Sequence, residues 1–248
     1  MQITQFSKQN NRPYQEDRSF IKIMKTGVLL GVFDGHGGEE VSDFCADNTV
    51  KIFNHISKEI KKDPEETLKQ LVKKLDEKTN YSYCGSTAAI VLIKNNEAHV
   101  AILGDSGVLI KTSSGSLWQS PEHNVRTNAK ECDEAKARGG WVDTNRGYLF
   151  DRNVYNGQGL QMSRALGDRE LSRVLNREPE IFHIPINKTS WILVYSDGLI
   201  DPSHANQNAV IGIVKAIETL PIGAEELVHA VSDVQNNDNS TAILARME

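Results

Sequence analysis

Cysteine is scarce in this sequence, with three residues among 248. Cys45, Cys84 and Cys132 are odd in number and widely spaced, so they form neither a disulfide framework nor a Cys-x-x-Cys zinc knuckle. We expect three small, buried thiols. This usage favours a reducing compartment. We expect the cytoplasm, with the nucleus equally permitted by the size of the chain.

Long apolar runs and basic blocks are also lacking. The chain has no run of about 18 apolar residues, the length that a membrane helix needs. The first ten residues are polar and carry no apolar signal core. No block of Lys and Arg is longer than two residues, and the formal net charge is −5, so a groove that tracks nucleic-acid phosphates is not expected. We therefore expect neither a membrane nor a nucleic acid as a partner.

The rest of the composition is that of a globular protein, with 39% hydrophobic and 25% charged residues. Because the chain has no repeat, linker or low-complexity tract, we expect a single domain over residues 1–248. Helical spacing of apolar residues predicts four helices, and Pro64 separates the first two, since proline is tolerated in a first turn but not inside a helix. The predicted helices span 39–62, 65–79, 206–219 and 224–235.

Short apolar runs predict strands, and two pairs of them form hairpins across Lys94–Glu97 and Ser113–Gly115. Hairpins mixed with helix pairs, without regular alternation of strand and helix, indicate an α+β fold with a largely antiparallel sheet or sandwich. The predicted strands span 28–33, 87–93, 98–103, 108–110, 117–118, 191–195 and 241–245.

Two of these apolar strands end in the same way, in Asp34-Gly35 and in Asp197-Gly198. A buried strand brings its terminal carboxylate to the mouth of a sheet, and the glycine leaves the backbone carbonyl accessible. Carboxylate and carbonyl oxygens are the ligands of hard cations such as Mg²⁺ and Mn²⁺. Each pair is equally compatible with a plain Asp-Gly turn. Further acidic residues stand beside glycine, asparagine or proline at similar boundaries, which favours one shared metal site: Glu16, Asp17, Asp105, Asp168 and Asp238.

Three other side chains in these segments have catalytic or binding chemistry. His36 lies in a glycine-rich turn and is either a general acid or base or a solvent-facing turn residue. The remaining six histidines include no pair at i and i+4 that would bind a metal. Arg12 and Arg164 are either phosphate clamps or salt-bridge partners, because a guanidinium matches phosphate and carboxylate oxygens alike.

With these residues in their order along the chain, the sequence resembles the metal-dependent protein Ser/Thr phosphatases of type 2C. The resemblance is carried by a series of motifs in the order and approximate spacing of that family, over nearly the whole chain. The motifs are Arg12-Pro13-Tyr14-Gln15-Glu16-Asp17, Asp34-Gly35-His36-Gly37-Gly38, Gly85-Ser86-Thr87-Ala88, Gly104-Asp105-Ser106, Gly139-Gly140, Met162-Ser163-Arg164-Ala165-Leu166-Gly167-Asp168, Ser196-Asp197-Gly198-Leu199-Ile200-Asp201 and Asp238-Asn239-Ser240-Thr241.

The resemblance implies a central antiparallel β-sandwich flanked on both faces by helix pairs. It also implies hydrolysis of phosphoserine and phosphothreonine in phosphorylated proteins by a water that bridges two Mg²⁺ or Mn²⁺ ions, with no phosphoenzyme. A monomer is the family-like expectation. The implied roles are metal ligation by Asp34 (bridging both ions), Asp168, Asp197, Glu16 and the carbonyl of Gly35; a weaker third ion at Asp105; support by Asp17, Asp238 and Asn239; phosphate binding by Arg12; and protonation of the leaving oxygen by His36.

Some positions depart from the family pattern. Gly107 follows Asp105-Ser106 where an arginine is usual, Glu122-His123-Asn124 replaces the usual Asp-His-Lys, and the segment 142–160, which includes the family's flap beside the active site, is altered. These changes leave the substrate preference open. They remove none of the implied metal ligands, nor Arg12 or His36.

Two other functions remain as alternatives to a protein phosphatase. A catalytically weak or inactive member of the family would act as a binding scaffold, and such members lose metal carboxylates that are all present here. An unrelated Mg²⁺-dependent phosphoesterase would act on small molecules. A cysteine-based phosphatase is not expected, because no arginine stands five residues beyond any cysteine.

Overall fold

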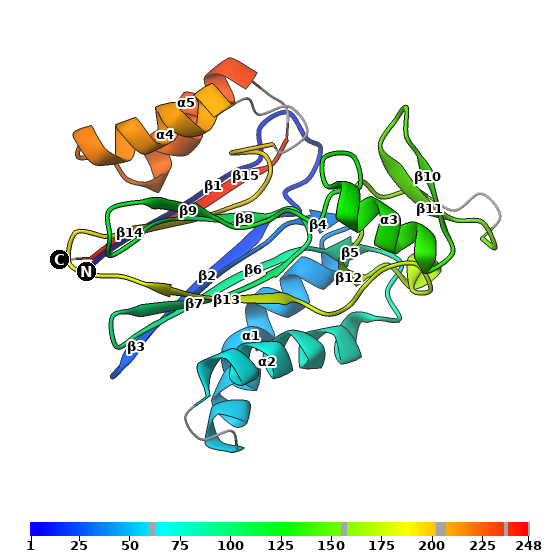
Figure 1. Ribbon diagram of the computed structural model, residues 1–248, viewed down its shortest axis with the longest axis horizontal. Coiled ribbons are helices and arrows are strands. Elements are labelled where there is room, and N and C mark those ends of the chain that lie inside the picture. Colours follow the sequence, from blue (N-terminus) through cyan, green and yellow to red (C-terminus); the bar gives the residue numbers. More distant parts are fainter. Residues whose placement is uncertain (60–62, 155–157, 202–206, 236–237, 248) are drawn as a thin grey trace.

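A computed structural model describes residues 1–59, 63–154, 158–201, 207–235 and 238–247 of the chain. Two five-stranded sheets lie face to face, and a pair of helices covers the outer face of each (Figure 1). Every pairing between named strands is antiparallel in these sheets. This arrangement confirms the α+β fold class, with its central antiparallel sandwich between helix pairs. None of the helices in the described segments is long and apolar enough to cross a membrane.

The first sheet contains both ends of the chain. It has the order β1-β15-β14-β8-β9, so the polar N-terminal strand β1 pairs with the last strand of the sequence over its full length. Strand β14 lies at the centre and is buried at every position. The strands are β1 (Gln2–Lys8), β15 (Ser240–Arg246), β14 (Trp191–Tyr195), β8 (Gly107–Lys111) and β9 (Leu117–Gln119).

The second sheet has the order β13-β7-β6-β3-β2. The predicted hairpin between β6 and β7 is confirmed, and its turn residues Asn95 and Asn96 have φ values of 54° and 61°. Two successive left-handed residues form the turn type that matches the twist of a two-residue hairpin, and asparagine tolerates that conformation. The strands are β13 (Glu180–Pro185), β7 (Glu97–Leu103), β6 (Ala88–Lys94), β3 (Gly27–Phe33) and β2 (Arg18–Met24).

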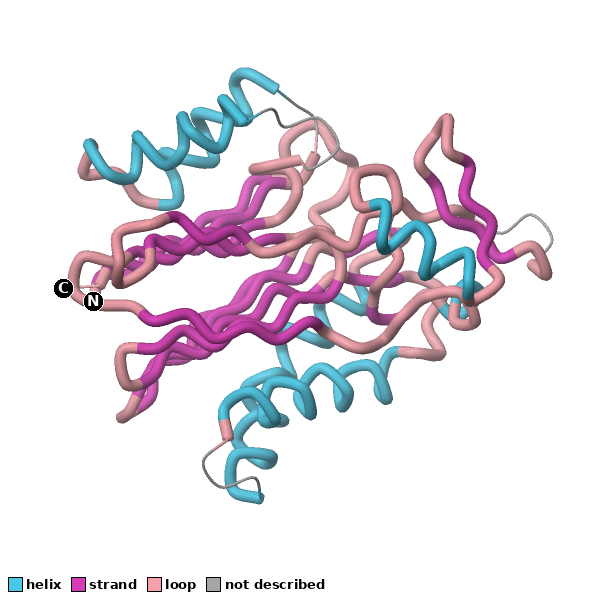
Figure 2. Tube along the Cα trace, viewed as in Figure 1, coloured by secondary structure: helices cyan, strands magenta, loops and turns pink. Residues whose placement is uncertain are grey.

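Three apolar layers hold the sandwich together, because β3, β6 and β14 are apolar on both faces. The middle layer lies between the two sheets and includes Leu30, Val91 and Ile192. The outer layers lie under the helices: α1 (Glu40–Glu59) and α2 (Pro64–Thr79) cover the second sheet, and α4 (Gln207–Thr219) and α5 (Ala224–Gln235) cover the first. Figure 2 shows these helices on the outer faces of both sheets.

The predicted break between the first two helices is confirmed. Pro64 occupies the first turn of α2, and the side chain of Asp63 accepts hydrogen bonds from the backbone N–H groups of Glu65 and Glu66. This cap satisfies two of the amides that a helix start leaves unpaired. Parts of two predicted helices, residues 60–62 and 206, lie outside the described residues.

Strands β1, β2 and β13, the helix α3 (Ala129–Ala137) and the hairpin of β10 (Gly140–Asp143) with β11 (Tyr148–Asp151) were not predicted. Polar residues interrupt the sequences of β1 and β2, so neither strand has a continuous apolar run. Helix α3 has nine residues, of which Glu131, Cys132 and Ala135 are buried. Tertiary contacts, rather than local pattern, determine these elements.

A buried ion pair joins α3 to the segment that leads to Asp168. Arg164 donates hydrogen bonds to both carboxylate oxygens of Glu131, at 3.1 Å and 2.5 Å, and Ser163 donates a third. Both residues of the pair are buried, with relative exposures of 5% for Arg164 and 1% for Glu131. Burial alone would raise the pKa of Glu131, but the hydrogen bonds from Arg164 and Ser163 outweigh burial and hold this pKa below its ordinary value.

We expect Glu131→Ala to lower the free energy of unfolding by roughly 3–5 kcal/mol, because it leaves the Arg164 guanidinium buried without its partner. Chemical denaturation at pH 7 measures this loss. Since the folded pKa of Glu131 is lowered, the pair stabilises the protein above the ordinary Glu pKa, and that contribution disappears as the pH falls below it. The control is Glu59→Ala, which removes an exposed partner of His55 and should cost less than about 1 kcal/mol. Equal losses in the two variants would contradict this role for Glu131.

Candidate active site

A cleft of about 690 Å³ opens at the end of the sandwich where β3 and β14 finish. Its walls come from segments that are far apart in the sequence. Nine of the predicted site residues line it: Arg12, Glu16, Asp34, Gly35, His36, Asp105, Asp168, Asp197 and Asp238. Asp17 and Asn239 do not line the cleft, and both side chains are buried next to residues that do. The structure thus brings the predicted set together, and the individual roles stay predictions.

Carboxylates crowd the floor of this cleft. Asp34 follows β3 and Asp197 follows β14, and Asp34 lies within hydrogen-bonding reach of both Asp197 and Asp17. Burial first, and then the charge of Asp17, raises the pKa of Asp34 well above its ordinary value; burial and Asp105 do the same to Asp197. Burial also raises the pKa of Asp17 to about 6, despite a hydrogen bond from Ser196 at 2.7 Å. The cluster therefore favours protons or cations over free negative charge.

Two oxygen atoms near this cluster are buried without a hydrogen bond, Oδ1 of Asp17 and Oδ1 of Asp105. A buried carboxylate oxygen without a partner is costly, so these atoms indicate a group that the protein alone does not supply. An all-oxygen donor set that raises its own pKa values fits Mg²⁺ or Mn²⁺. Mg²⁺ keeps several waters and takes one or two carboxylates, so a few of these side chains suffice to hold it.

The segment that contains Glu16 is fixed against the loop after β3. Oε1 of Glu16 accepts a hydrogen bond from the backbone of Gly38 at 2.7 Å, and its carbonyl accepts from Gly35 and from Ser42. A side chain at Gly35 would approach the Glu16 carbonyl oxygen to 2.6 Å, so glycine is required for this close contact. The side chain of Asn239 accepts a hydrogen bond from the Glu16 backbone at 2.7 Å.

His36 lies on a small sheet that sequence patterns did not predict. The order is β12-β5-β4, with β4 (Gly35–His36), β5 (Gly85–Ser86) and β12 (Leu166–Gly167). This sheet places Nε2 of His36 at 2.8–2.9 Å from the two carboxylate oxygens of Asp168. A Cβ atom at Gly85 would lie 2.1 Å from Oδ2 of Asp168 and 2.4 Å from that nitrogen, so glycine is required for the pair to form.

The proton affinity of His36 follows from this pairing. Burial lowers the pKa of His36, but the charge of Asp168 and the hydrogen bond to it more than compensate, so the pKa stands above its ordinary value. Its other ring nitrogen, Nδ1, is buried without a partner. Pairing with Asp168 therefore favours the protonated form of His36.

Arg12 lies at the rim of the cleft and is half exposed. Its Nη2 donates to Oδ2 of Asp238 at 2.7 Å, and 48% of its side chain remains accessible. The ion pair orients the guanidinium while leaving other N–H groups for an anion in the cleft. Two aromatic residues that sequence reasoning did not identify, Tyr83 and Tyr148, also line the cleft, and the guanidinium of Arg169 lies 5.5 Å from the Tyr83 ring centre.

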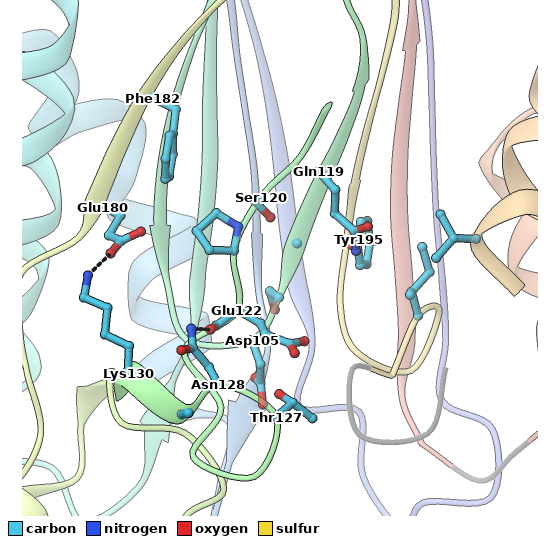
Figure 3. Close-up of a pocket in the computed structure, with 16 residues that line it drawn as sticks. Asp105, Gln119, Ser120, Glu122, Thr127, Asn128, Lys130, Glu180, Phe182 and Tyr195 are labelled. Atoms are coloured by element: carbon cyan, nitrogen blue, oxygen red, sulfur yellow. Dashed lines mark hydrogen bonds and ion pairs between the residues drawn. The ribbon is translucent and has the colours of Figure 1, made fainter. Parts of the chain in front are cut away.

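Asp105 lines both this cleft and a second pocket of about 830 Å³. In Figure 3 Asp105 and Glu122 extend into the same part of that pocket, below Ser120 and Tyr195. Asn124, where the family has lysine, donates to Oδ2 of Asp105 at 3.3 Å. Gly107, where the family has arginine, has no space for a side chain, because the ring of Tyr195 lies 2.4 Å from the position of a Cβ atom.

The structure decides two other sequence-based interpretations. Arg164 is a salt-bridge partner of Glu131 and not a phosphate clamp, and it does not line the cleft. The spacing argument against a cysteine-based phosphatase is wrong, because five residues do separate Cys132 from Arg138. The structure excludes such a loop on other grounds: Cys132 is buried within α3, and Arg138 donates to the carbonyl of Val174. All three cysteines are free and buried, as predicted.

Within the described residues, two groups of three side chains have donor atoms within 4.8 Å of one another, and both lie outside the cleft. The group of His123, Glu131 and Glu180 is already neutralised, because Arg164 binds both carboxylates. The group of Glu97, His99 and His183 has no such cation, and it is considered below.

Comparison with known proteins gives a consistent result. A family model described as protein phosphatase 2C matches residues 11–240. The chain is 29% identical to the Arabidopsis thaliana "Probable protein phosphatase 2C 76" and 29% identical to the Bos taurus "Protein phosphatase 1L", over 88% and 91% of its length. It spans 51% and 67% of those two relatives, so it corresponds to about half to two thirds of their length.

Solved structures show the same fold at lower sequence identity. A serine-threonine phosphatase 2C from Toxoplasma gondii superimposes with a TM-score of 0.78 at 20% identity, and the match covers 98% of this chain and 93% of that one. A C. elegans sex determining protein gives a TM-score of 0.80 at 23% identity, and covers 98% of this chain and 64% of that one.

We expect divalent cations to stabilise the protein increasingly as the pH rises. The folded pKa values of Asp17, Asp34 and Asp197 are raised, so the contribution of these three groups to the stability of the metal-free fold is greatest below the ordinary Asp pKa of about 3.9. That contribution is lost as the pH rises through the folded values, about 6 for Asp17. Cations remove this repulsion. At a concentration of about 100 times Kd, one ion contributes ~2.7 kcal/mol, or a rise in Tm of roughly 5–10 °C.

Thermal unfolding with Mg²⁺ and with chelator, between pH 5 and pH 7.5, measures this effect. Asp34→Asn should raise the Tm of the chelated protein at pH 7 and reduce its response to Mg²⁺. Asp133→Asn, at a side chain that is 80% exposed, is the matched control and should change neither value. A response to Mg²⁺ that does not depend on pH would contradict the carboxylate cluster as its origin.

Proposed function

The chain belongs to the protein phosphatase 2C family, and we propose that it is a metal-dependent protein serine/threonine phosphatase. The observation that carries this proposal is the cleft in which seven acidic residues, Arg12 and His36 meet. The chain spans only part of the length of its relatives, so their activity is not carried over to it by family membership alone. Support for catalysis comes from the acidic residues themselves, since the cleft retains every carboxylate that the family's chemistry uses.

Two Mg²⁺ or Mn²⁺ ions would be held on the floor of this cleft. Asp34 would contact both, Asp168 and Asp197 would complete one site, and Glu16 with the Gly35 carbonyl would serve the other. Asp105 would hold a weaker third ion. Bound there, divalent cations supply positive charge for the phosphoryl oxygens and lower the pKa of a water molecule between them.

Arg12 and His36 act on opposite ends of the bond that is broken. Arg12, oriented by Asp238, binds the phosphate oxygens through N–H groups that remain exposed at the rim. His36 delivers a proton to the serine or threonine oxygen as it leaves, because an alkoxide is a poor leaving group. The charge of Asp168 raises the pKa of the ring, which favours the protonated form that a general acid needs. General acid catalysis of this kind contributes ~10²–10⁴-fold.

Water is the nucleophile in this proposal, and no phosphoenzyme forms. Among the described residues that line the cleft there is no cysteine, serine or threonine. The carboxylate of Asp34 is already within hydrogen-bonding reach of Asp17 and Asp197. The residues that line the cleft would bind a phosphorylated protein segment as substrate.

We propose that the protein acts as a monomer in the cytoplasm or nucleus.

We expect the protein to release phosphate from a phosphothreonine peptide with Mn²⁺ or Mg²⁺ and not with chelator. Asp197→Ala should lower kcat by at least about 10²–10³-fold, since it removes charge stabilisation at the reacting phosphate. Asp133→Ala, at an exposed position, is the matched control and should retain full activity. Absence of metal-dependent release from a folded, metal-bound protein would contradict the proposal and favour the scaffold function.

A parallel comparison with nucleotide and sugar phosphates tests the substrate class. Faster release from those small molecules than from the phosphopeptide would identify a small-molecule phosphoesterase instead.

We expect Arg12→Ala to raise KM for the phosphopeptide and to weaken inhibition by inorganic phosphate, each by roughly 10–100-fold, because a charge-assisted hydrogen bond contributes ~1.5–3 kcal/mol. Arg12→Lys should recover part of the loss, since it keeps the charge without the forked geometry. Lys188→Ala, which removes an exposed cation that does not line the cleft, is the control. Unchanged KM and unchanged phosphate inhibition in Arg12→Ala would rule out this role.

A further inference from the structure

Two histidines that are 84 positions apart in the sequence lie opposite each other in the second sheet. His99 on β7 pairs in register with His183 on β13, and their rings are parallel within 8° with centres 5.0 Å apart. Glu97 precedes His99 by two residues, so it lies on the same face of β7. A search for histidines at i and i+4 does not detect this group, because strand pairing creates it.

Both imidazoles turn one nitrogen toward the same carboxylate. Nε2 of His183 lies 3.1 Å from Oε1 of Glu97, and Nε2 of His99 lies 3.5 Å from Oε2. The donor atoms of the three residues all lie within 4.8 Å of one another. In a tetrahedral site with bonds of ~2.0–2.1 Å, ligand atoms lie roughly 3.3 Å apart, so small side-chain rotations suffice to close the group around one ion.

The surroundings of His99 add a second, independent observation. His99 is buried, with 5% relative exposure, and its Nδ1 atom has no hydrogen-bond partner. A buried imidazole normally has both nitrogens satisfied, and neither Glu97 contact reaches Nδ1. Burial and the neighbouring His183 lower the pKa of His99, while Glu97 and Glu65 raise it and Lys94 lowers it further. The net effect keeps the ring neutral, which is the form that binds metals.

We propose that Glu97, His99 and His183 form a binding site for a transition-metal ion of the zinc class. Two imidazole nitrogens and one carboxylate are a ligand set that prefers Zn²⁺, Ni²⁺ or Cu²⁺ and disfavours Mg²⁺. His183 and Glu97 are 41% and 43% exposed, so an ion can enter from solvent, and water would complete its coordination.

This site is separate from the cleft. His99 and Asp105 are six residues apart on an extended strand and its continuation, which corresponds to roughly 20 Å. The proposed ion would link β13, an edge strand of its sheet, to β7. Its expected effect is therefore on the stability of that edge, and the site does not depend on phosphatase activity.

Zinc binding to the full chain tests the proposal, with Mg²⁺ present at a saturating concentration to occupy the carboxylate cleft. We expect the wild-type protein to bind one more Zn²⁺ per chain than His183→Ala, and Glu97→Gln to weaken that binding at least tenfold. His55→Ala is the matched control, because His55 forms an exposed pair with Glu59 and belongs to no group of three possible ligands among the described residues. The His55→Ala variant should bind zinc like the wild type.

Nitrogen-15 NMR of the histidine rings in the wild-type protein gives a readout that no variant can confound. Zn²⁺ should shift the ring nitrogens of His99 and His183 and leave those of His55 and His229 unchanged. Equal zinc stoichiometry in wild type and His183→Ala, or unshifted His99 and His183 rings at millimolar Zn²⁺, would overturn the proposal.

Discussion

Burial of closely spaced carboxylates is the constraint on which this structure depends. Asp17, Asp34, Asp105 and Asp197 converge at one end of the sandwich; burial is the first cause that raises the pKa of each, and the charge of at least one neighbouring aspartate adds to it. Only a rigid support keeps like charges together, and the apolar strands β3 and β14 supply it, since each is buried at nearly every position up to the aspartate. Burial of the hydrophobic core thus stabilises the fold and offsets the free energy that burial of the cleft carboxylates costs.

Small polar contacts then fix where each charge points. Asn239 holds the chain around Glu16 through three hydrogen bonds, to the Glu16 amide and to the carbonyls of Gln9 and Tyr14. The two-residue strands β4, β5 and β12 hold His36 against Asp168. Asp168 itself has a left-handed backbone, with φ of 48°, which is uncommon outside glycine and typical of a functional position. These contacts are short in range, yet they connect segments up to about 230 residues apart.

The elements that the sequence predicted are those with a local cause. Continuous apolar runs predicted β3, β6, β7 and β14, Pro64 predicted the break before α2, and the Asp-Gly pairs indicated oxygen ligands. The elements that it did not predict depend on partners: β1 is polar and is ordered by pairing with β15, and α3 is fixed by the Glu131–Arg164 pair. The same distinction applies to side chains. Arg164 has the same chemistry as Arg12 in sequence, and only burial beside Glu131 separates a structural arginine from one at the rim.

The two ends of the second sheet present different kinds of possible metal-ligand atoms. Among the described residues that line the cleft, the possible metal ligands are mainly oxygens, and His36 is the one imidazole. His36 is already paired with a carboxylate, so a nitrogen-preferring ion gains little there. At the hairpin end, two imidazoles share one carboxylate, so an oxygen-preferring ion gains little in turn. Because β7 runs between these ends, with His99 near its start and Asp105 just beyond its end, one strand separates two donor sets of opposite preference. That separation would allow each set to select an ion by donor type, without either competing for the other's ligand.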